Sequence, residues 1–174
     1  MKLLTLITIL LSTPTIAETH KAHVHGLAKV ALAIETPTTA NIDLDVAGDS
    51  IMGFEHPATT AKDKKTMEDS FNKLKTGAAS VIKFDPVLKC VITAKEVGLE
   101  KEEAPKGTPT EHGQHADVNA SYTVKCEKPL SGSKIQVGLI ALFPKVKSAN
   151  LEILTATGQI QQNVKGEHDS VTIP

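Results

Sequence analysis

The sequence predicts a single α+β domain in which helices pack on one face of an antiparallel sheet. Two observations carry this prediction. Several segments alternate apolar and polar residues with the period of a strand, and others repeat apolar residues at helical spacing. In chain order these segments follow the pattern ββαββαββ, with helices and strands that must share one apolar core, and a cross-strand disulfide is expected.

The first 17 residues have the composition of a secretory signal peptide. Lys2 supplies a positive charge, residues 3–11 are apolar but too few to span a bilayer, and Thr15 and Ala17 are the small residues of a cleavage site. We therefore expect residues 1–17 to be removed. Residues 18–174 would then form one exported domain without membrane insertion.

The first two strands are expected to form a hairpin. Residues 24–34 and residues 41–48 both alternate, and a proline-containing turn separates them. Placing Ile34 opposite Ile42 matches the two apolar faces. Extending that pairing brings the histidines before the first strand to the GFEHP segment at residues 53–57.

A helix is expected after this hairpin. Met67 and Phe71 belong to an apolar stripe, a threonine at position 59 or 60 can cap the start, and Gly77 can end the helix. Residues 134–143 are compatible with a second helix or with a strand. Two closing strands are expected on either side of Gly158, at residues 149–157 and 171–174.

The only two cysteines lie in the strand-like segments 87–95 and 120–127. Pairing Ala94 with Tyr122 places Cys90 opposite Cys126, and export would bring both thiols into an oxidising compartment. We expect a disulfide; a pair of zinc thiolates is the alternative.

Residues 98–119, between the cysteine strands, have no periodicity. The segment is charged and contains Pro, Gly and two histidines. A loop of this length in a small domain is usually functional or disordered, so we expect a flexible histidine-containing loop.

Three groups of residues are candidate metal ligands: HKAHVHG at residues 20–26, GFEHP, and EHGQH in the loop. Imidazoles that share a strand face, together with a carboxylate, suit Zn²⁺. The candidate ligands are His20, His23, His25, Glu55, His56, His112 and His115.

Each group also has a structural interpretation. The opening histidines could belong to a solvated strand start, and those of the loop could simply be solvated. In GFEHP, Phe54 could anchor a bend while Pro57 opens a helix and Glu55 lies near its N-terminus. His168, which is alone in a turn, is interpreted as structural or solvated.

Cleavage after Ala17 would create a different metal site. The α-amine of Glu18, two amides and the imidazole of His20 form a square-planar nitrogen set that suits Cu²⁺ or Ni²⁺. A copper or nickel carrier is therefore a second hypothesis, and a non-catalytic envelope interaction module is a third.

Several functions are not expected. The chain has no arginine, which argues against nucleic-acid binding. It contains no serine nucleophile elbow, no phosphate-binding loop and no dinucleotide fingerprint, so we do not expect an enzyme.

The leader, the HKAHVHG opener, the GFEH segment, the two cysteine strands and the histidine-bearing loop together resemble the ZrgA-like zinc-regulated periplasmic proteins of Gram-negative bacteria. The resemblance implies a periplasmic zinc-binding protein that works in zinc uptake, beside a zinc ABC importer or its binding protein. It places zinc on the residues that match the family's motifs, which are His23, His25, His56, His112 and His115. The family's long histidine- and aspartate-rich loop is shortened here to EHGQHAD, which implies a smaller zinc capacity.

Overall fold

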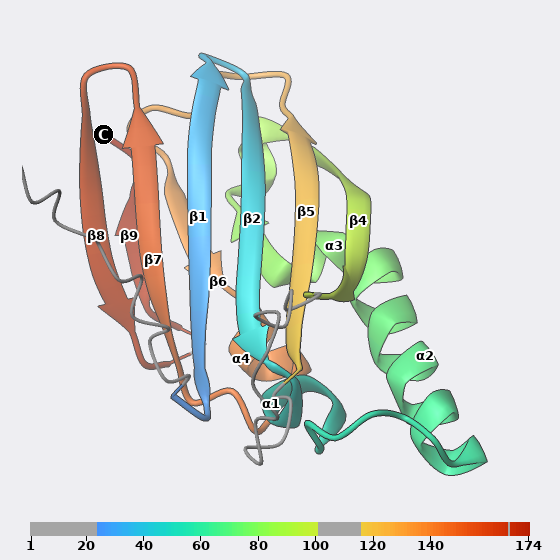
Figure 1. Cartoon of the computed structure of the whole chain (residues 1–174). Coiled ribbons are helices and arrows are strands. Elements are labelled where there is room, and N and C mark those ends of the chain that lie inside the picture. The colour runs from blue at the N-terminus through green and yellow to red at the C-terminus, as the bar shows by residue number, and fades with distance from the viewer. Residues whose placement is uncertain (1–23, 101–115, 167) are drawn as a thin grey trace, which may run out of the picture.

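The computed structural model describes residues 24–100, 116–166 and 168–174 (Figure 1). The elements in these ranges confirm the α+β class. In chain order they are β1 (Leu27–Thr36), β2 (Thr39–Ala47), α1 (Gly48–Met52), α2 (Ala61–Thr76), α3 (Ala78–Val81), β3 (Ile82–Phe84), a 3₁₀ turn (Pro86–Leu88), β4 (Val91–Leu99), β5 (Asp117–Lys125), β6 (Lys134–Val137), α4 (Leu139–Leu142), β7 (Ser148–Thr155), β8 (Gly158–Val164) and β9 (Ser170–Thr172).

A six-stranded sheet with the order β4-β5-β2-β1-β7-β8 is the main layer. The helices and a three-stranded sheet, β3-β6-β9, lie behind it, and its other face points toward the viewer in Figure 1. Side chains from the rear of the large sheet and from the second layer form one buried cluster. Burial of this apolar surface provides the main driving force for folding.

β1 and β2 form the predicted hairpin, but with a different register. Leu32, rather than Ile34, lies opposite Ile42. A change of two residues leaves every side chain on its predicted face, because side chains alternate along a strand with a period of two. The turn is correspondingly tighter, with Pro37 and Thr38 between the strands.

The strand pairing does not continue to residues 51–56, and this part of the prediction was wrong. Residues from Gly48 onward form α1 instead. The Gly48 amide donates to the Ala116 carbonyl at 2.8 Å. A Cβ on Gly48 would lie 2.4 Å from that oxygen, so only glycine lets the chain turn into the helix so close to the start of β5.

The large sheet is mixed rather than purely antiparallel. β7 pairs parallel to β1, in a register that places Leu27 opposite Ser148. The parallel pairing follows from the path of residues 134–143, which form β6 and then α4 behind the sheet and lead the chain back to the end where β1 begins. The chain therefore enters β7 from the same end at which it enters β1.

The predicted amphipathic helix is confirmed as α2. The Thr60 hydroxyl accepts a hydrogen bond from the Asp63 amide at 3.1 Å, which caps the first turn, and Gly77 follows the last one. Leu74 is fully buried. The hydroxyl of Tyr122 reaches the Leu74 carbonyl at 3.5 Å, and burial raises the pKa of that phenol.

Cys90 and Cys126 form the predicted disulfide, and the predicted pairing of Ala94 with Tyr122 is also observed. The zinc-thiolate alternative is therefore wrong. The connection between these strands is shorter than the predicted loop at residues 98–119, because β4 continues to Leu99 and β5 begins at Asp117.

The signal peptide at residues 1–17 and the flexibility of residues 101–115 lie outside the described residues. No helix in the described part of the chain is both long enough and apolar enough to cross a membrane.

Reduction of the disulfide is expected to lower the free energy of unfolding by about 3–4 kcal/mol. The bond joins residues separated by 36 positions and limits the entropy of the unfolded chain. Urea titrations with and without reductant measure the difference. Reductant should have no effect on a Cys90→Ala/Cys126→Ala variant, and equal stability of the oxidised and reduced wild-type chains would contradict the prediction.

Candidate metal site

The start of β1 is held in place by Gly26. Its amide donates to the buried Ser50 hydroxyl at 2.9 Å, and its carbonyl accepts from the amides of Lys147 and Ser148 at 2.7 and 3.1 Å. Gly26 has φ +80°, a backbone conformation that side chains with a Cβ rarely adopt. One glycine therefore joins β1, α1 and the start of β7.

This junction fixes the position of His25, the residue before Gly26. Nε2 of His25 lies 3.5 Å from Oε1 of Glu55, and Nδ1 lies 3.7 Å from Oδ2 of Asp49. Asp49 belongs to α1, and Glu55 lies in the segment that follows this helix. The predicted meeting of the opening histidines with GFEHP is therefore observed for His25 and Glu55, although a helix rather than a longer hairpin brings them together.

The spacing between His25 and Glu55 fits two ligands of one zinc ion. Ligand atoms at about 2.0–2.1 Å from a tetrahedral zinc are roughly 3.3 Å apart, close to the observed 3.5 Å. Asp49 faces the other ring nitrogen and also forms an ion pair with Lys145. At 3.7 Å the carboxylate is beyond hydrogen-bond distance, but it lies on the side of the ring from which a carboxylate commonly orients a ligating imidazole.

The exposure of the two side chains differs. His25 is 59% exposed, whereas the Glu55 side chain is 14% exposed. A cation would therefore reach the imidazole directly from solvent and find the carboxylate already held in the protein. Such a half-open group suits reversible binding better than permanent enclosure.

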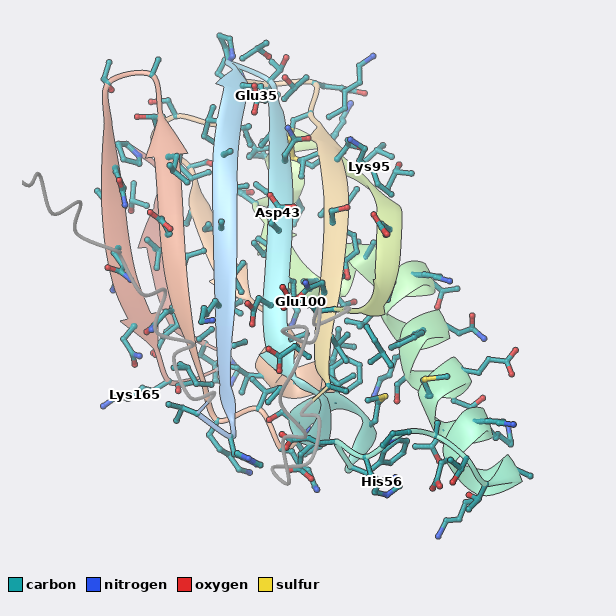
Figure 2. The ribbon with its side chains drawn as sticks, in the orientation of Figure 1. Glu35, Asp43, His56, Lys95, Glu100 and Lys165 are labelled. Atoms are coloured by element: carbon teal, nitrogen blue, oxygen red, sulfur yellow. A yellow bond between two sulfur atoms is a disulfide. The ribbon has the colours of Figure 1, made fainter. Side chains whose placement is uncertain are left out.

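His56 is placed by its immediate neighbours. Its ring stacks on Phe54 with centroids 4.8 Å apart, and Nδ1 lies 3.1 Å from the Pro57 carbonyl. If Nδ1 carries the proton and donates to that carbonyl, Nε2 has the lone pair that a metal requires. Figure 2 shows His56 at the end of the sheet where α1 and α2 meet.

The other candidate ligands, His20, His23, His112 and His115, lie outside the described residues, as does the proposed copper set at Glu18. The described chain nevertheless shows where the loop begins and ends. The Glu100 amide donates to the Asp117 carbonyl at 2.8 Å, and Ala116 accepts from Gly48 at the start of α1. Both ends of the loop therefore belong to the same end of the sheet as Asp49.

The sequence did not predict a group of three carboxylates near these loop ends. Asp45, Glu100 and Asp117 offer oxygens that all lie within 4.8 Å of one another, and Asp117 is buried. Asn119, opposite Asp45, adds an amide oxygen that is buried without a hydrogen-bond partner in the described structure. Alternation predicts the face of each strand, but only the pairing of β2 with β5 brings these residues together.

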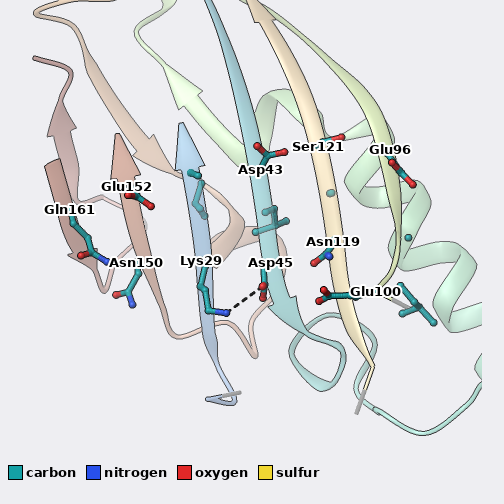
Figure 3. Close-up of a pocket in the computed structure, with 16 residues that line it drawn as sticks. Lys29, Asp43, Asp45, Glu96, Glu100, Asn119, Ser121, Asn150, Glu152 and Gln161 are labelled. Atoms are coloured by element: carbon teal, nitrogen blue, oxygen red, sulfur yellow. Dashed lines mark hydrogen bonds and ion pairs between the residues drawn. The ribbon is translucent and has the colours of Figure 1, made fainter. Parts of the chain in front are cut away.

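Asp45, Glu100 and Asn119 line a hollow of about 780 Å³ on the open face of the large sheet. Figure 3 shows Asp43 and Glu152 lining the same hollow. The Lys29 ammonium donates a hydrogen bond to the Asp45 carboxylate there at 3.3 Å. An all-oxygen set suits hard cations such as Ca²⁺ or Mg²⁺ better than Zn²⁺, which favours nitrogen and sulfur. The described group with a nitrogen ligand is the one around His25.

Comparison with known proteins gives one result. The model of the family described as "ZrgA family zinc uptake protein" matches residues 22–173. No curated protein matches the chain.

Replacing Lys145 with Met is expected to lower the free energy of unfolding of the metal-free protein at pH 7 by roughly 0.5–1 kcal/mol. The hydrogen bond from Lys145 to Asp49 lowers the pKa of Asp49 below its usual 3.8. Because the carboxyl is more acidic in the folded protein, the ion pair stabilises the fold fully above the pKa of Asp49 in the unfolded chain. This stabilisation is lost as the pH falls through the lower pKa of the folded state. The difference between wild type and variant should therefore shrink in acid, as measured by urea unfolding at several pH values.

An Asp49→Asn variant is the matched control for this pH series. In this background, which lacks the carboxylate, Lys145→Met should change the free energy of unfolding only slightly and by the same amount at every pH. A wild-type difference that stayed constant from neutral pH into strong acid would show that the ion pair is not its source.

Proposed function

Because the chain belongs to the ZrgA family of zinc uptake proteins, we propose that it binds Zn²⁺ as cargo through His25 and Glu55 and passes the ion to an importer. Its role is in zinc uptake, and its partner is a metal ion. The observation that carries the proposed site is the 3.5 Å approach of an imidazole nitrogen to a largely buried carboxylate. These are two of the ligand types that zinc prefers in proteins.

A zinc ion takes four ligands in most closed sites, so His25 and Glu55 need further partners. His56 is adjacent to Glu55, and His23 is two residues before His25. His112 and His115 belong to the loop whose ends lie beside α1 and β5. We propose that the remaining ligands come from these histidines, and that loading and release depend on how many of them bind at once.

The location and manner of action follow from the same proposal. The leader at residues 1–17 would export the chain, and the disulfide is typical of an oxidising compartment. In a Gram-negative cell that compartment is the periplasm, where a zinc ABC importer or its binding protein would receive the ion. The proposed role is binding and delivery rather than catalysis.

Zinc binding by the metal-free protein is expected to weaken by at least roughly 100-fold in a His25→Ala/Glu55→Gln variant, because ligand losses exceed the usual 10–100-fold effect of orienting residues. Titration calorimetry at neutral pH measures the affinity. His168→Ala, which removes a histidine from the turn before β9, should retain wild-type affinity.

A second matched variant distinguishes the two clusters. Asp45→Asn/Glu100→Gln removes two carboxylates from the oxygen-only group and should leave the main zinc affinity unchanged. Loss of zinc binding in this variant, with retention in His25→Ala/Glu55→Gln, would move the cargo site to the sheet face.

Growth under zinc limitation tests delivery in the cell. A strain without this protein is expected to grow poorly in medium containing a zinc chelator, and the wild-type gene should restore growth. The His25→Ala/Glu55→Gln gene should not, although the variant accumulates in the periplasmic fraction. Full rescue by that variant would contradict the role of this site in uptake, whatever its affinity in solution.

A further inference from the structure

β8 lies at one edge of the large sheet and pairs, among the described strands, with β7 alone. Its seven residues, GQIQQNV, contain no charge and no proline, and six of the seven are exposed or half-buried. The register with β7 runs without interruption from Thr155–Gly158 to Ala149–Val164. The outer edge of β8 is therefore a regular row of backbone amides and carbonyls open to another strand.

The opposite edge of the sheet is protected. β4 has an irregularity between Ala94 and Glu96, carries the charged Lys95 and Glu96, and contacts α2. Bulges, charges and covering helices are the usual means by which proteins prevent an edge from pairing. Because the chain protects β4 and leaves β8 regular and uncharged, the β8 edge is suited to pairing.

The open face of the β7–β8 pair already carries a ladder of polar side chains. The side-chain amide of Asn163 donates a hydrogen bond to the side-chain oxygen of Asn150 at 2.8 Å, and the side-chain amide of Gln159 donates one to the Glu152 carboxylate. Gln161 lies opposite Glu152 in the register and points to the same face (Figure 3). An added strand that presents amides at these positions would continue the ladder.

We propose that β8 pairs antiparallel with β8 of a second copy of this chain, around a two-fold axis at Gln161. The two Gln161 side chains then face each other, and Gln159 of each copy faces Asn163 of the other. On the rear face, Ile160 meets Gln162. Every cross-strand pair is uncharged, so the strand is complementary to itself, as a two-fold interface requires.

The neighbouring charges are compatible with this pairing. The two Glu152 carboxylates would be separated by three strand spacings, roughly 14 Å, which exceeds the screening length of about 8 Å at physiological salt. The interface is short, and a contact of this size corresponds to a weak dimer that forms reversibly. It joins the two six-stranded sheets edge to edge and needs no metal ion.

Analytical ultracentrifugation of the mature protein tests the proposal. The wild-type chain should shift from monomer toward dimer as its concentration rises, equally with and without Zn²⁺. Gln161→Glu places four carboxylates in a row across the axis and should weaken dimerisation at least about fivefold, since like charges directly opposite are destabilising. Thr93→Glu, on the protected edge strand, is the matched control and should dimerise as wild type does.

A charge-swap experiment separates loss of pairing from loss of folding. Gln161→Lys alone should also dimerise weakly, but an equal mixture with Gln161→Glu should form the heterodimer, because opposite charges then meet at the axis. A wild-type chain that remains monomeric at all concentrations overturns the proposal. This holds even if the β8 edge then pairs with a strand of another protein. A dimer that is unaffected by both variants also overturns it.

Discussion

The hydrogen bonds of Gly26 are the constraint on which the candidate site depends. They join the start of β1 to Ser50 in α1 and to the start of β7. These three segments come from both ends of the described chain, and their meeting makes the sheet mixed, since β7 must run parallel to β1. The same junction places His25 where it meets Asp49 and Glu55, so one glycine links the topology of the sheet to the chemistry at its end.

The two faces of the large sheet differ in burial and in composition. The rear face is covered by the helices and the small sheet and supplies the core. The open face is lined by small and polar side chains and is rich in carboxylates, with Asp45, Glu100 and Asp117 near the end that carries α1. The carboxylates in the hollow outnumber its lysine, Lys29, so the field of this face would raise the local concentration of cations.

The chemistry of the His25 group is consistent with a carrier of ions. Its imidazole is open to solvent, its neighbouring carboxylate is largely buried, and Lys145 holds Asp49 in its charged form by lowering the pKa of that carboxyl. In the proposed delivery role, His25 and Glu55 would be the fixed ligands of the ion, and its release would follow the loss of the other ligands.

The sequence by itself determined the α+β class, the faces of the strands, the cap and end of α2, and the Cys90–Cys126 pair, because these depend on local periodicity and on residues in paired strands. It also predicted that the opening histidine segment would meet GFEHP, but it assigned Glu55 to His20 or His23 rather than to His25. Only the tertiary structure decided the parallel placement of β7, the change from strand to helix at Gly48, and the grouping of Asp45, Glu100 and Asp117. These features require segments distant in sequence to pack together, and alternation specifies the face of a side chain but not the strand beside it.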